Sequence, residues 1–532
     1  MQVAGYDGGP IIIKVGKGFV VGPHGILIAT FNSSMGSPNS SIVKPALLVA
    51  TGRGVALAAM FAVPMFFARV LAPGEFGTYK QFFLIHATFY GIALGLAEGL
   101  FYFLPLDAAN SGRYVANSLA MLTACGIAGL LLLSGGAGWI GRIFNNPELG
   151  RLAPLLGIYL LMTLASSPLE IVMLSRSRNL SASVSYALSD VLRAGLLLLP
   201  VMVWRTVGVL VAGSIAFAAA RLIAFIIYIC RDYGGRLVLD FSCLRRQLSY
   251  SAPLQLAVAL QVLQVNWHQC IVSMSFDAAT FARYAVGCMQ IPVFEIIAGS
   301  VCSVMMVQMG YRLKDRDHEA VVQIWSDTTT KLALMFFPAV FLLFVAVPDL
   351  ITVLFTAAYA SSTPIIRVWL LSFSLSAFQP HAVLRVYNDT RFLAIQNLCK
   401  LAFVAVLIIP AIQRFGLVGA VTVTVGAILL GKCMLLMRLK KHVHSTCSSI
   451  LPWRSIGHVV MMSTIATVPA AVFRYSLHSA AIARLSTTVA IYSVTYLLVG
   501  LFFLRRSQEC SDLLRLTKSM PKRLTGIMAG KA

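Results

Sequence analysis

A long apolar run extends from Ala46 to Ala72, and Arg53 and Arg69 are its two ionisable residues. At 1.5 Å per residue, a helix of this length crosses the roughly 30 Å hydrocarbon core of a bilayer. Pro73 and Gly74 then turn the chain, because proline cannot donate a backbone hydrogen bond and glycine relaxes the φ angle. The run therefore predicts a membrane-spanning helix, and about thirteen similar runs follow it.

The composition excludes an ordinary soluble protein. Of the 532 residues, 58% are hydrophobic and 11% are charged, against roughly 25% charged residues in soluble domains. A soluble enzyme with a few membrane anchors would need a polar block of about a hundred residues or more, and the sequence contains none. We therefore predict an all-α polytopic membrane protein, because a helix satisfies its own backbone hydrogen bonds in lipid.

The formal net charge of +23 does not indicate a nucleic-acid partner. The basic residues are spread over short loops and do not form stripes interleaved with aromatic residues. The ten cysteines lie mostly inside apolar runs without ligand spacing, so neither disulfides nor a metal site is expected. His442, His444 and Cys447 come nearest to a metal cluster, but a solvated basic loop explains them. We expect no cofactor.

Polar breaks divide the chain into six parts. Residues 1–44, rich in Gly, Ser, Pro and Asn, are interpreted as a mobile cytoplasmic tail. The remaining parts are a first six-helix lobe (45–230), a cytoplasmic connector (231–248), a second six-helix lobe (249–437), a cytoplasmic loop with two further helices (438–504), and a basic cytoplasmic tail (505–532). The prediction is about fourteen spans, with two lobes around a central cavity.

The later spans are expected near residues 249–275, 284–309, 328–348, 364–385, 391–411, 413–437, 455–477 and 480–504. Alternate loops differ in their content of Lys and Arg. Loops on one side, together with the C-terminal tail, hold roughly 23 basic residues and the opposite loops roughly ten. Because basic loops stay in the cytoplasm, both termini are predicted to be cytoplasmic.

The two lobes repeat a short pattern. Phe76-Gly77-Thr78-Tyr79 leads from the first helix into the second, and Phe281-Ala282-Arg283-Tyr284 leads from the seventh into the eighth. Each pattern follows a turn of small residues. Together with the central polar break, this repetition indicates an internal duplication, which commonly places a substrate path between the halves.

In these features the chain resembles the multidrug/oligosaccharidyl-lipid/polysaccharide flippase superfamily, and within it the bacterial polysaccharide-biosynthesis flippases. The family opens with Gly-Arg early in helix one and then Ala-Arg-x-Leu-x-Pro-x-x-Phe-Gly-x-Tyr. This chain has Gly52-Arg53 and the run from Ala68 to Tyr79 in the corresponding places. The end of helix two, Ala97 to Pro105, resembles the acidic-Gly motif of polysaccharide and lipid II flippases. The motifs cover residues 45–110.

The resemblance implies a transporter, not an enzyme. Its cargo would be a polyprenyl-phosphate-linked oligosaccharide, moved by alternating access from the inner to the outer leaflet of the bacterial inner membrane. Such a cargo requires a wet, cationic cavity that opens laterally to lipid. A proton, Na⁺ or the membrane potential would drive transport, and a glycan polymerase or other export components would be partners beside the membrane lipids.

Charged residues inside spans are costly and usually face a cavity or a partner. The basic candidates are Arg53, Arg221, Lys331, Lys400 and Lys432. Arg53 is the first choice for an anionic headgroup, because a guanidinium offers paired donors to phosphate oxygens. An arginine that snorkels to the membrane interface is an equal alternative for Arg53, and snorkelling is favoured for Lys331.

Acidic and polar residues complete the set of candidates. Asp190 and Arg193 lie three residues apart on one helix face, so an internal salt bridge is expected in preference to direct contact with cargo. Buried acids could bind a coupling cation, because burial raises the pKa of a carboxyl group, but for each of them a structural hydrogen bond is the favoured explanation. The further candidates are Glu98, Glu170, Glu295, His86, Asn266 and His268. Interhelical hydrogen bonds are expected for the last three.

Two other functions remain open. A cation-coupled multidrug antiporter of the same superfamily would share the two-lobe plan, but the extra helix pair and the Phe-Gly-x-Tyr opening favour the flippase. A membrane glycan polymerase or ligase would need a large outer catalytic loop or an acidic metal-binding motif. The predicted outer loops are short, and no paired acidic motif lies beside a span.

Overall fold

The structure is a computed structural model that describes residues 19–21, 27–29, 62–176, 178–234, 237–443, 451–477 and 479–506. Two short strands, β1 (Phe19–Val21) and β2 (Leu27–Ala29), pair antiparallel. They lie inside the segment 1–44 that was predicted to be a mobile tail, and the other residues of that segment lie outside the described part of the chain. The rest of the described chain is helical with short connections, as the all-α prediction required.

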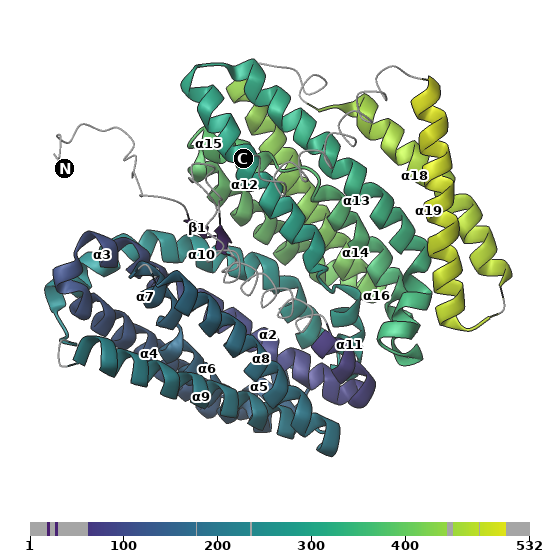
Figure 1. The fold of residues 1–532 in the computed structure, drawn as a ribbon. Helices are drawn as coiled ribbons and strands as arrows, with labels where there is room; N and C mark the ends of the chain where they lie inside the picture. The colour runs from purple at the N-terminus through teal and green to yellow at the C-terminus, as the bar shows by residue number, and fades with distance from the viewer. Residues whose placement is uncertain are drawn as a thin grey trace, which may run out of the picture.

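The helices form two bundles, one on either side of α2 (Pro73–Glu98) and α10 (Phe241–Ser275), as Figure 1 shows. We call residues 62–234 the first lobe and residues 237–443 the second lobe. Besides α2 and a helical stretch at 62–70, the first lobe contains α3 (Leu100–Leu106), η1 (Ala108–Asn110), α4 (Ser111–Gly135), α5 (Ala137–Ile143), α6 (Pro147–Ser166), α7 (Leu169–Ser175), α8 (Asn179–Trp204) and α9 (Val207–Tyr233).

The second lobe begins with α10 and continues to Val443. Its other elements are α11 (Ala278–Gly287), α12 (Pro292–Lys314), α13 (His318–Leu354), η3 (Ala357–Ser362), α14 (Thr363–Leu375), α15 (Pro380–Val386) and α16 (Thr390–Val443). The described part of the chain ends in a pair of helices, α18 (Trp453–Ser476) and α19 (Ala481–Arg506). This pair lies on the outer edge of the second lobe (Figure 1).

Ten of the described helices are long and apolar enough to cross a membrane, or eleven if one bent pair counts as a single span. The predicted total of about fourteen is therefore not confirmed. One reason is Gly416, whose φ of 58° and ψ of −139° break α16 into two halves that cover the predicted spans 391–411 and 413–437. Short broken elements such as α14 and α15 also replace single straight spans.

The predicted repetition has a counterpart in the structure. Phe76 is the fourth residue of α2, and Phe281 is the fourth residue of α11. The two helix starts also lie against each other, since a Cβ atom added at Gly77 would lie 1.8 Å from the backbone oxygen of Ala278. Only glycine permits this approach of the two backbones.

Close packing between α2 and α10 joins the lobes along the length of both helices. A Cβ atom added at Gly95 would lie 2.3 Å from the Gln255 side chain, and one added at Gly99 would lie 2.5 Å from Ser251. Farther along, the Asn266 side chain donates a hydrogen bond to the Thr88 hydroxyl at 3.0 Å. The helices therefore run antiparallel, and the interhelical hydrogen bond expected for Asn266 is present.

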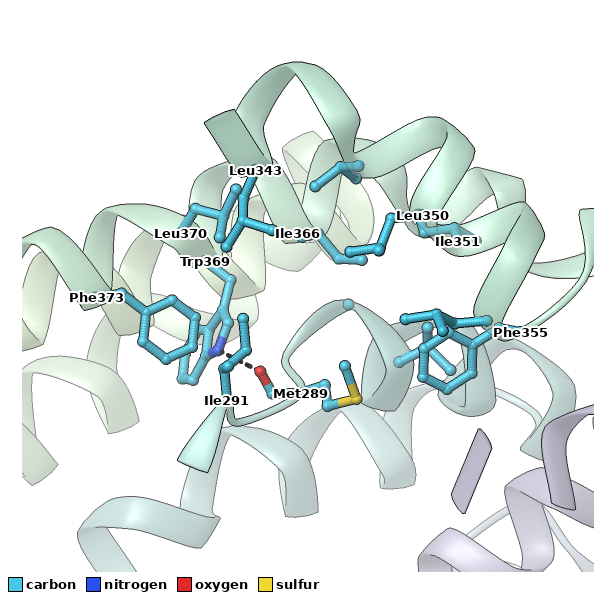
Figure 2. A pocket seen from close by; sticks show the side chains of 14 residues that line it. Met289, Ile291, Leu343, Leu350, Ile351, Phe355, Ile366, Trp369, Leu370 and Phe373 are labelled. Carbon is cyan, nitrogen blue, oxygen red and sulfur yellow. Dashed lines mark hydrogen bonds between the residues drawn. The ribbon is translucent and has the colours of Figure 1, made fainter. Parts of the chain in front are cut away.

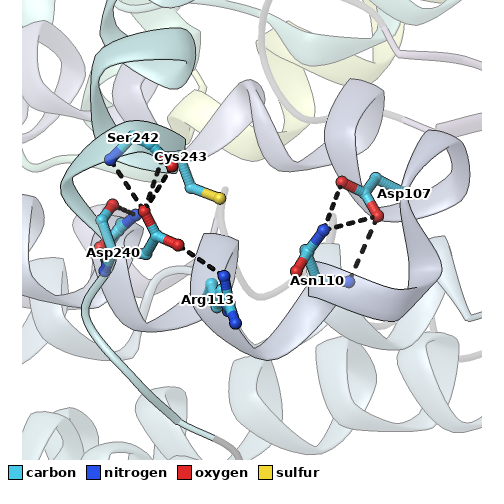
Figure 3. Close-up of polar contacts among 7 residues, drawn as sticks. Asp107, Asn110, Arg113, Asp240, Ser242 and Cys243 are labelled. Atoms are coloured by element: carbon cyan, nitrogen blue, oxygen red, sulfur yellow. Dashed lines mark hydrogen bonds and ion pairs between the residues drawn. The ribbon is translucent and has the colours of Figure 1, made fainter.

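The connector between the lobes is shorter than predicted. Helix α9 continues to Tyr233, and α10 begins at Phe241, inside the segment 231–248 that was expected to be a loop. The Asp240 carboxylate caps α10 by accepting hydrogen bonds from the backbone of Ser242 and Cys243 (Figure 3). The Ser242 and Cys243 donors and Arg113 lower the pKa of Asp240 well below its usual range.

The capped end of α10 is fixed to the first lobe through α4. Arg113 forms an ion pair with the Asp240 carboxylate at 2.7 Å (Figure 3). The Asn117 side chain exchanges two hydrogen bonds with the Asp240 backbone, at 2.9 and 3.2 Å, and Gln247 donates to the Ser118 hydroxyl at 2.5 Å. The second lobe is thus connected to the first by specific polar contacts as well as by covalent continuity.

Candidate functional site

The first lobe encloses a charged pair between its helices. Arg221 of α9 and Glu170 of α7 form an ion pair at 2.6 Å, with side chains 16% and 2% exposed. The Ser185 hydroxyl of α8 donates to the other oxygen of Glu170 at 3.3 Å. Both charges lie within apolar spans, where an unpaired charge would be costly. Sequence reasoning treated these two residues as separate candidates, and the structure brings them together.

Aromatic and polar side chains from α2 and α6 lie near this pair. The His86 ring nitrogen Nε2 lies 3.0 Å from the Thr163 hydroxyl, and the His86 ring lies 4.4 Å from that of Tyr159. Tyr90 stacks on His86 at 5.4 Å and is close enough to Arg221 to interact electrostatically. The interhelical hydrogen bond expected for His86 is therefore present.

Asp190 and Arg193 of α8 are both exposed, and no ion pair of the described residues joins them. The salt bridge expected from their spacing is not formed. The Arg193 guanidinium instead lies over the Phe83 ring at 5.8 Å. Spacing along a helix places two side chains on one face, but it does not determine the partner that each of them reaches.

The second lobe holds basic side chains on both halves of α16. Lys400 donates to the Gln264 side-chain oxygen of α10 at 2.9 Å, and Lys432 donates to the Phe378 backbone oxygen at 2.5 Å. Lys400 and Lys432 interact electrostatically with each other. Among the ion pairs of the described residues, neither lysine has a carboxylate partner.

The remaining candidates lie apart from these groups. His268 of α10 is buried, and its Nδ1 atom lies 2.8 Å from the Tyr284 hydroxyl, an interhelical contact as expected. Glu98 is the half-buried last residue of α2, and Glu295 is exposed in the first turn of α12. Arg53 lies outside the described residues, so its role remains a prediction.

Two of the cavities lined by the described side chains lie in the second lobe. The smaller lies inside the second lobe, has a volume of about 30 Å³ and is lined almost entirely by apolar side chains such as Ile291, Leu343 and Phe373 (Figure 2). It holds about one water molecule, so it is a packing gap rather than a binding site for a sugar. The larger, of about 520 Å³, is an open hollow beside Tyr311 and Arg312. The central cavity between the lobes remains a prediction.

Sequence reasoning did not find the ion pairs that hold the C-terminal helices in place. Asp349 of α13 accepts from Arg474 of α18 at 2.6 Å and from Arg484, at the start of α19, at 2.9 Å. Asp349 is 2% exposed, so the two arginines neutralise a buried charge. A single acidic residue near the end of an apolar run indicates a buried charge that needs a partner. The partners of Asp349 could not be identified from the sequence, because they lie more than a hundred residues away.

No group of three or more His, Cys, Asp or Glu side chains suited to a metal ion occurs in the described part of the chain. His442, considered above for a metal, donates from Nε2 to the Asp389 carboxylate at 2.9 Å. Arg438 contacts the same carboxylate oxygen at 2.6 Å. Arg438 and His442 therefore tie the C-terminal end of α16 to the Asp389 carboxylate.

The fold is shared with solved membrane proteins. The structure is similar to "Lipid II flippase MurJ, inward closed conformation", with a TM-score of 0.70, 13% identity, and coverage of 86% of this chain and 99% of that one. It is also similar to an inward-facing multidrug resistance MATE family transporter of the MOP superfamily, with a TM-score of 0.56, 15% identity, and coverage of 74% and 96%. At these identities the likeness establishes the fold. No curated protein matches the sequence.

A third structure, a MOP superfamily transporter from Pyrococcus furiosus, has a TM-score of 0.50, 13% identity, and coverage of 77% of this chain and 98% of that one. The family follows from a separate match. The model of the family described as "Polysaccharide biosynthesis protein" matches residues 66–364, more than half of the chain. The chain therefore belongs to this polysaccharide biosynthesis family and is a multi-pass membrane protein with the MOP superfamily fold.

Proposed function

We propose that the protein is a flippase that moves a lipid-linked oligosaccharide from the inner to the outer leaflet of the bacterial cytoplasmic membrane. The observation that carries the proposal is the combination of the polysaccharide biosynthesis family with a fold shared by a lipid II flippase. The cargo would be a glycan joined through phosphate to a polyprenyl chain. Alternating access between the two lobes, with both termini in the cytoplasm, would carry it across.

The charges inside the spans support an anionic cargo. Arg193, Lys400 and Lys432 lie in apolar segments without a carboxylate ion-pair partner among the described residues. Their insertion is costly, and a phosphate group arriving with the cargo would compensate that cost. A proton or Na⁺ gradient or the membrane potential would supply the energy.

A cation-coupled multidrug antiporter is the second candidate, because the fold is also shared with a MATE transporter. The ion pair between Glu170 and Arg221 favours the flippase. The pairing with Arg221 removes Glu170 as a free carboxylate for a coupling cation, and among the acid candidates inside the first lobe it leaves Glu98 and Asp190. A glycan polymerase or ligase finds no support in the transporters that share the fold.

Reconstitution tests the proposal directly. Purified protein in liposomes should expose a fluorescent lipid-linked oligosaccharide to a membrane-impermeant quencher, and protein-free liposomes should not. In cells, deletion of the gene should remove surface glycan and leave drug sensitivity unchanged. Altered drug sensitivity with intact surface glycan would instead establish the antiporter, and joining of sugars by the purified protein would establish an enzyme.

A further inference from the structure

The ends of three helices in the second lobe meet at Tyr387. This residue follows α15, and its ring stacks with two imidazole rings. The His318 ring, at the first residue of α13, lies 5.9 Å from it between ring centroids, and the His442 ring, near the end of α16, lies 5.0 Å from it. The Nδ1 atom of His318 also lies 2.8 Å from the Tyr387 hydroxyl. One aromatic ring therefore joins the ends of α13, α15 and α16.

The His442 imidazole also reaches an acid. Its Nε2 atom donates to the Asp389 carboxylate at 2.9 Å, and the Nε atom of Arg438 donates to the same oxygen at 2.6 Å. The side chains of His442 and Asp389 are 27% and 12% exposed, so water screens the pair only in part. We call the set of His318, Tyr387, Asp389, Arg438 and His442 the histidine clamp.

The first lobe contains the same arrangement with permanent charges. The seven-residue helix α7 corresponds to α15, and the final helix α9 corresponds to the second half of α16. Arg176 directly follows α7, as Tyr387 follows α15, and it forms an ion pair with Asp232 in the last turn of α9. Arg178 pairs with the other oxygen of Asp232 at 2.9 Å. The Arg176 guanidinium also lies over the Tyr233 ring at 4.0 Å.

The two lobes differ in the chemistry of the second cation. In each lobe one carboxylate has two basic partners, and in the second lobe one of these partners is a histidine. Arginine keeps its charge throughout the physiological range, whereas an imidazole is charged only after it gains a proton, between about pH 5 and 8. The first lobe therefore holds permanently the arrangement that the second lobe completes when His442 is protonated.

The charges around His442 set the direction of the response. Asp389 favours the protonated imidazole, and Arg438 opposes it. Lys440 and Lys441 lie on the same helix end and are exposed, so water weakens their opposing effect. The two arginines of the first lobe show that this fold accommodates two cations on one carboxylate. Protonation of His442 therefore strengthens its contact with Asp389.

The surroundings of His318 act in the same direction. Its neighbours along the chain are Asp317, which caps the start of α13, and Glu319, whereas the opposing Arg316 is exposed. The side of α15 offers the ring and hydroxyl of Tyr387. A protonated imidazole is attracted by the π electrons of an aromatic ring, and a charged donor forms a stronger hydrogen bond.

We propose that the histidine clamp is a proton-operated device that holds the ends of α13, α15 and α16 together more tightly as the pH falls from about 8 to about 6. Protonation of His442 adds the second cation to Asp389, and protonation of His318 strengthens the contact with Tyr387. Loss of both protons leaves Arg438 as the cation that the structure pairs with Asp389. The predicted topology places the loop after α16 in the cytoplasm, so the clamp restrains the second lobe in response to cytoplasmic pH.

Hydrogen exchange of the purified full chain in detergent, measured by mass spectrometry at about pH 6 and about pH 8, tests this proposal. The reporter is the turn 386–389 between α15 and α16. The end of α9 in the same sample is the reference, because its two arginines keep their charge in this range. His442→Arg supplies a permanent charge, and His442→Gln removes the charge. His458→Gln is the matched control, since it removes a histidine of α18 outside the clamp.

We expect the turn in the wild type to exchange about threefold more slowly at the lower pH, relative to the reference, because a partly exposed ion pair adds stability of this size. His442→Arg should exchange slowly at both pH values, and His442→Gln should exchange faster at both. His318→Gln leaves the pairing of Asp389 intact and should keep only part of the response. His458→Gln should keep all of it.

A wild-type exchange ratio that is equal at the two pH values would overturn the proposal. A full wild-type response in His442→Arg would do the same. If His442→Arg failed to fold, the proposal would still be overturned by a full response in both His442→Gln and His318→Gln. The exchange experiment contains no cargo, so its outcome is independent of the flippase test.

Discussion

The Nε atom of Arg69 donates a hydrogen bond to the backbone oxygen of Leu354, 3.1 Å away, and a second guanidinium nitrogen contacts the oxygen of Val353. Arg69 precedes α2 in the first lobe, and Leu354 is the last residue of α13 in the second. A cation from one lobe therefore caps the carbonyl end of a helix in the other, where the helix dipole favours positive charge. Nearby, the Phe76 and Tyr359 rings also meet across the lobes, at 5.7 Å.

Replacing Arg69 with Ala should loosen this contact between the lobes. We expect a loss of about 1 kcal/mol, because charged hydrogen bonds at a partly exposed position are removed. The measurement is the thermal midpoint of the purified protein, together with the labelling rate of a cysteine introduced at Ala278. Labelling should accelerate in the variant. Arg414→Ala, which removes an exposed arginine from α16, should change neither quantity.

Gly77→Ala should lower the stability of the fold by more than the addition of one methyl group usually does. The new methyl group would lie 1.8 Å from the Ala278 backbone oxygen, so the starts of α2 and α11 must separate. A cost of about 1–3 kcal/mol is expected from this overpacking, measured as a lower thermal midpoint. Gly74→Ala is the matched control three residues earlier, where an added Cβ meets nothing within 4 Å. Equal midpoints for the two variants would contradict the close contact.

Asp349→Asn should release the C-terminal helices from α13. The change leaves Arg474 and Arg484 without their shared carboxylate, and breaking a buried ion pair costs about 3–5 kcal/mol. Limited proteolysis followed by mass spectrometry should show faster cleavage within the α18–α19 pair in the variant than in the wild type. Asp315→Asn removes an exposed acid and should leave the cleavage rate unchanged.

The end of α16 should make stability depend on pH in acid solution. Hydrogen bonds from Arg438 and His442 lower the pKa of the Asp389 carboxyl below its usual value of 3.8. A lowered pKa means that the contribution to stability is present above the usual value and is lost as the pH falls through the lower folded-state value. Thermal midpoints of the wild type should therefore fall more steeply below about pH 4 than those of Asp389→Asn. Parallel curves would show that Asp389 contributes nothing.

Much of the fold could be predicted from apolar periodicity. The C-terminal pair was expected at 455–477 and 480–504, and α18 and α19 begin and end within a few residues of those bounds. The start of α10 was misplaced by about eight residues, because the amphipathic stretch after Asp240 is polar enough to resemble a loop. Asp240 is a residue type that commonly caps the start of a helix, so it marked the true start of α10. A prediction from hydropathy alone does not use this signal.

The candidate residues were harder to predict than the helices. Asp190 and Arg193 lie three residues apart in the sequence and were expected to form a salt bridge. Arg221 instead forms one with Glu170, which lies 51 positions away. Partners of this kind are set by which helices pack together, and a single sequence does not contain that information. The polar character of Lys400 and Lys432 was visible, but their common location depended on the break at Gly416 that folds α16 back.

The pair α18–α19 takes its principal contacts from α13 and lies on the edge of the second lobe that faces away from the first (Figure 1). Its small core, which includes Ala466, Ala470 and Tyr492, packs against Phe341 and Leu342 of α13. If the two lobes rotate relative to each other during transport, the α18–α19 pair should move as a rigid unit with the second lobe, against which it packs. A spectroscopic label on the outer side of α19 would therefore report the tilt of that lobe without disturbing the interior.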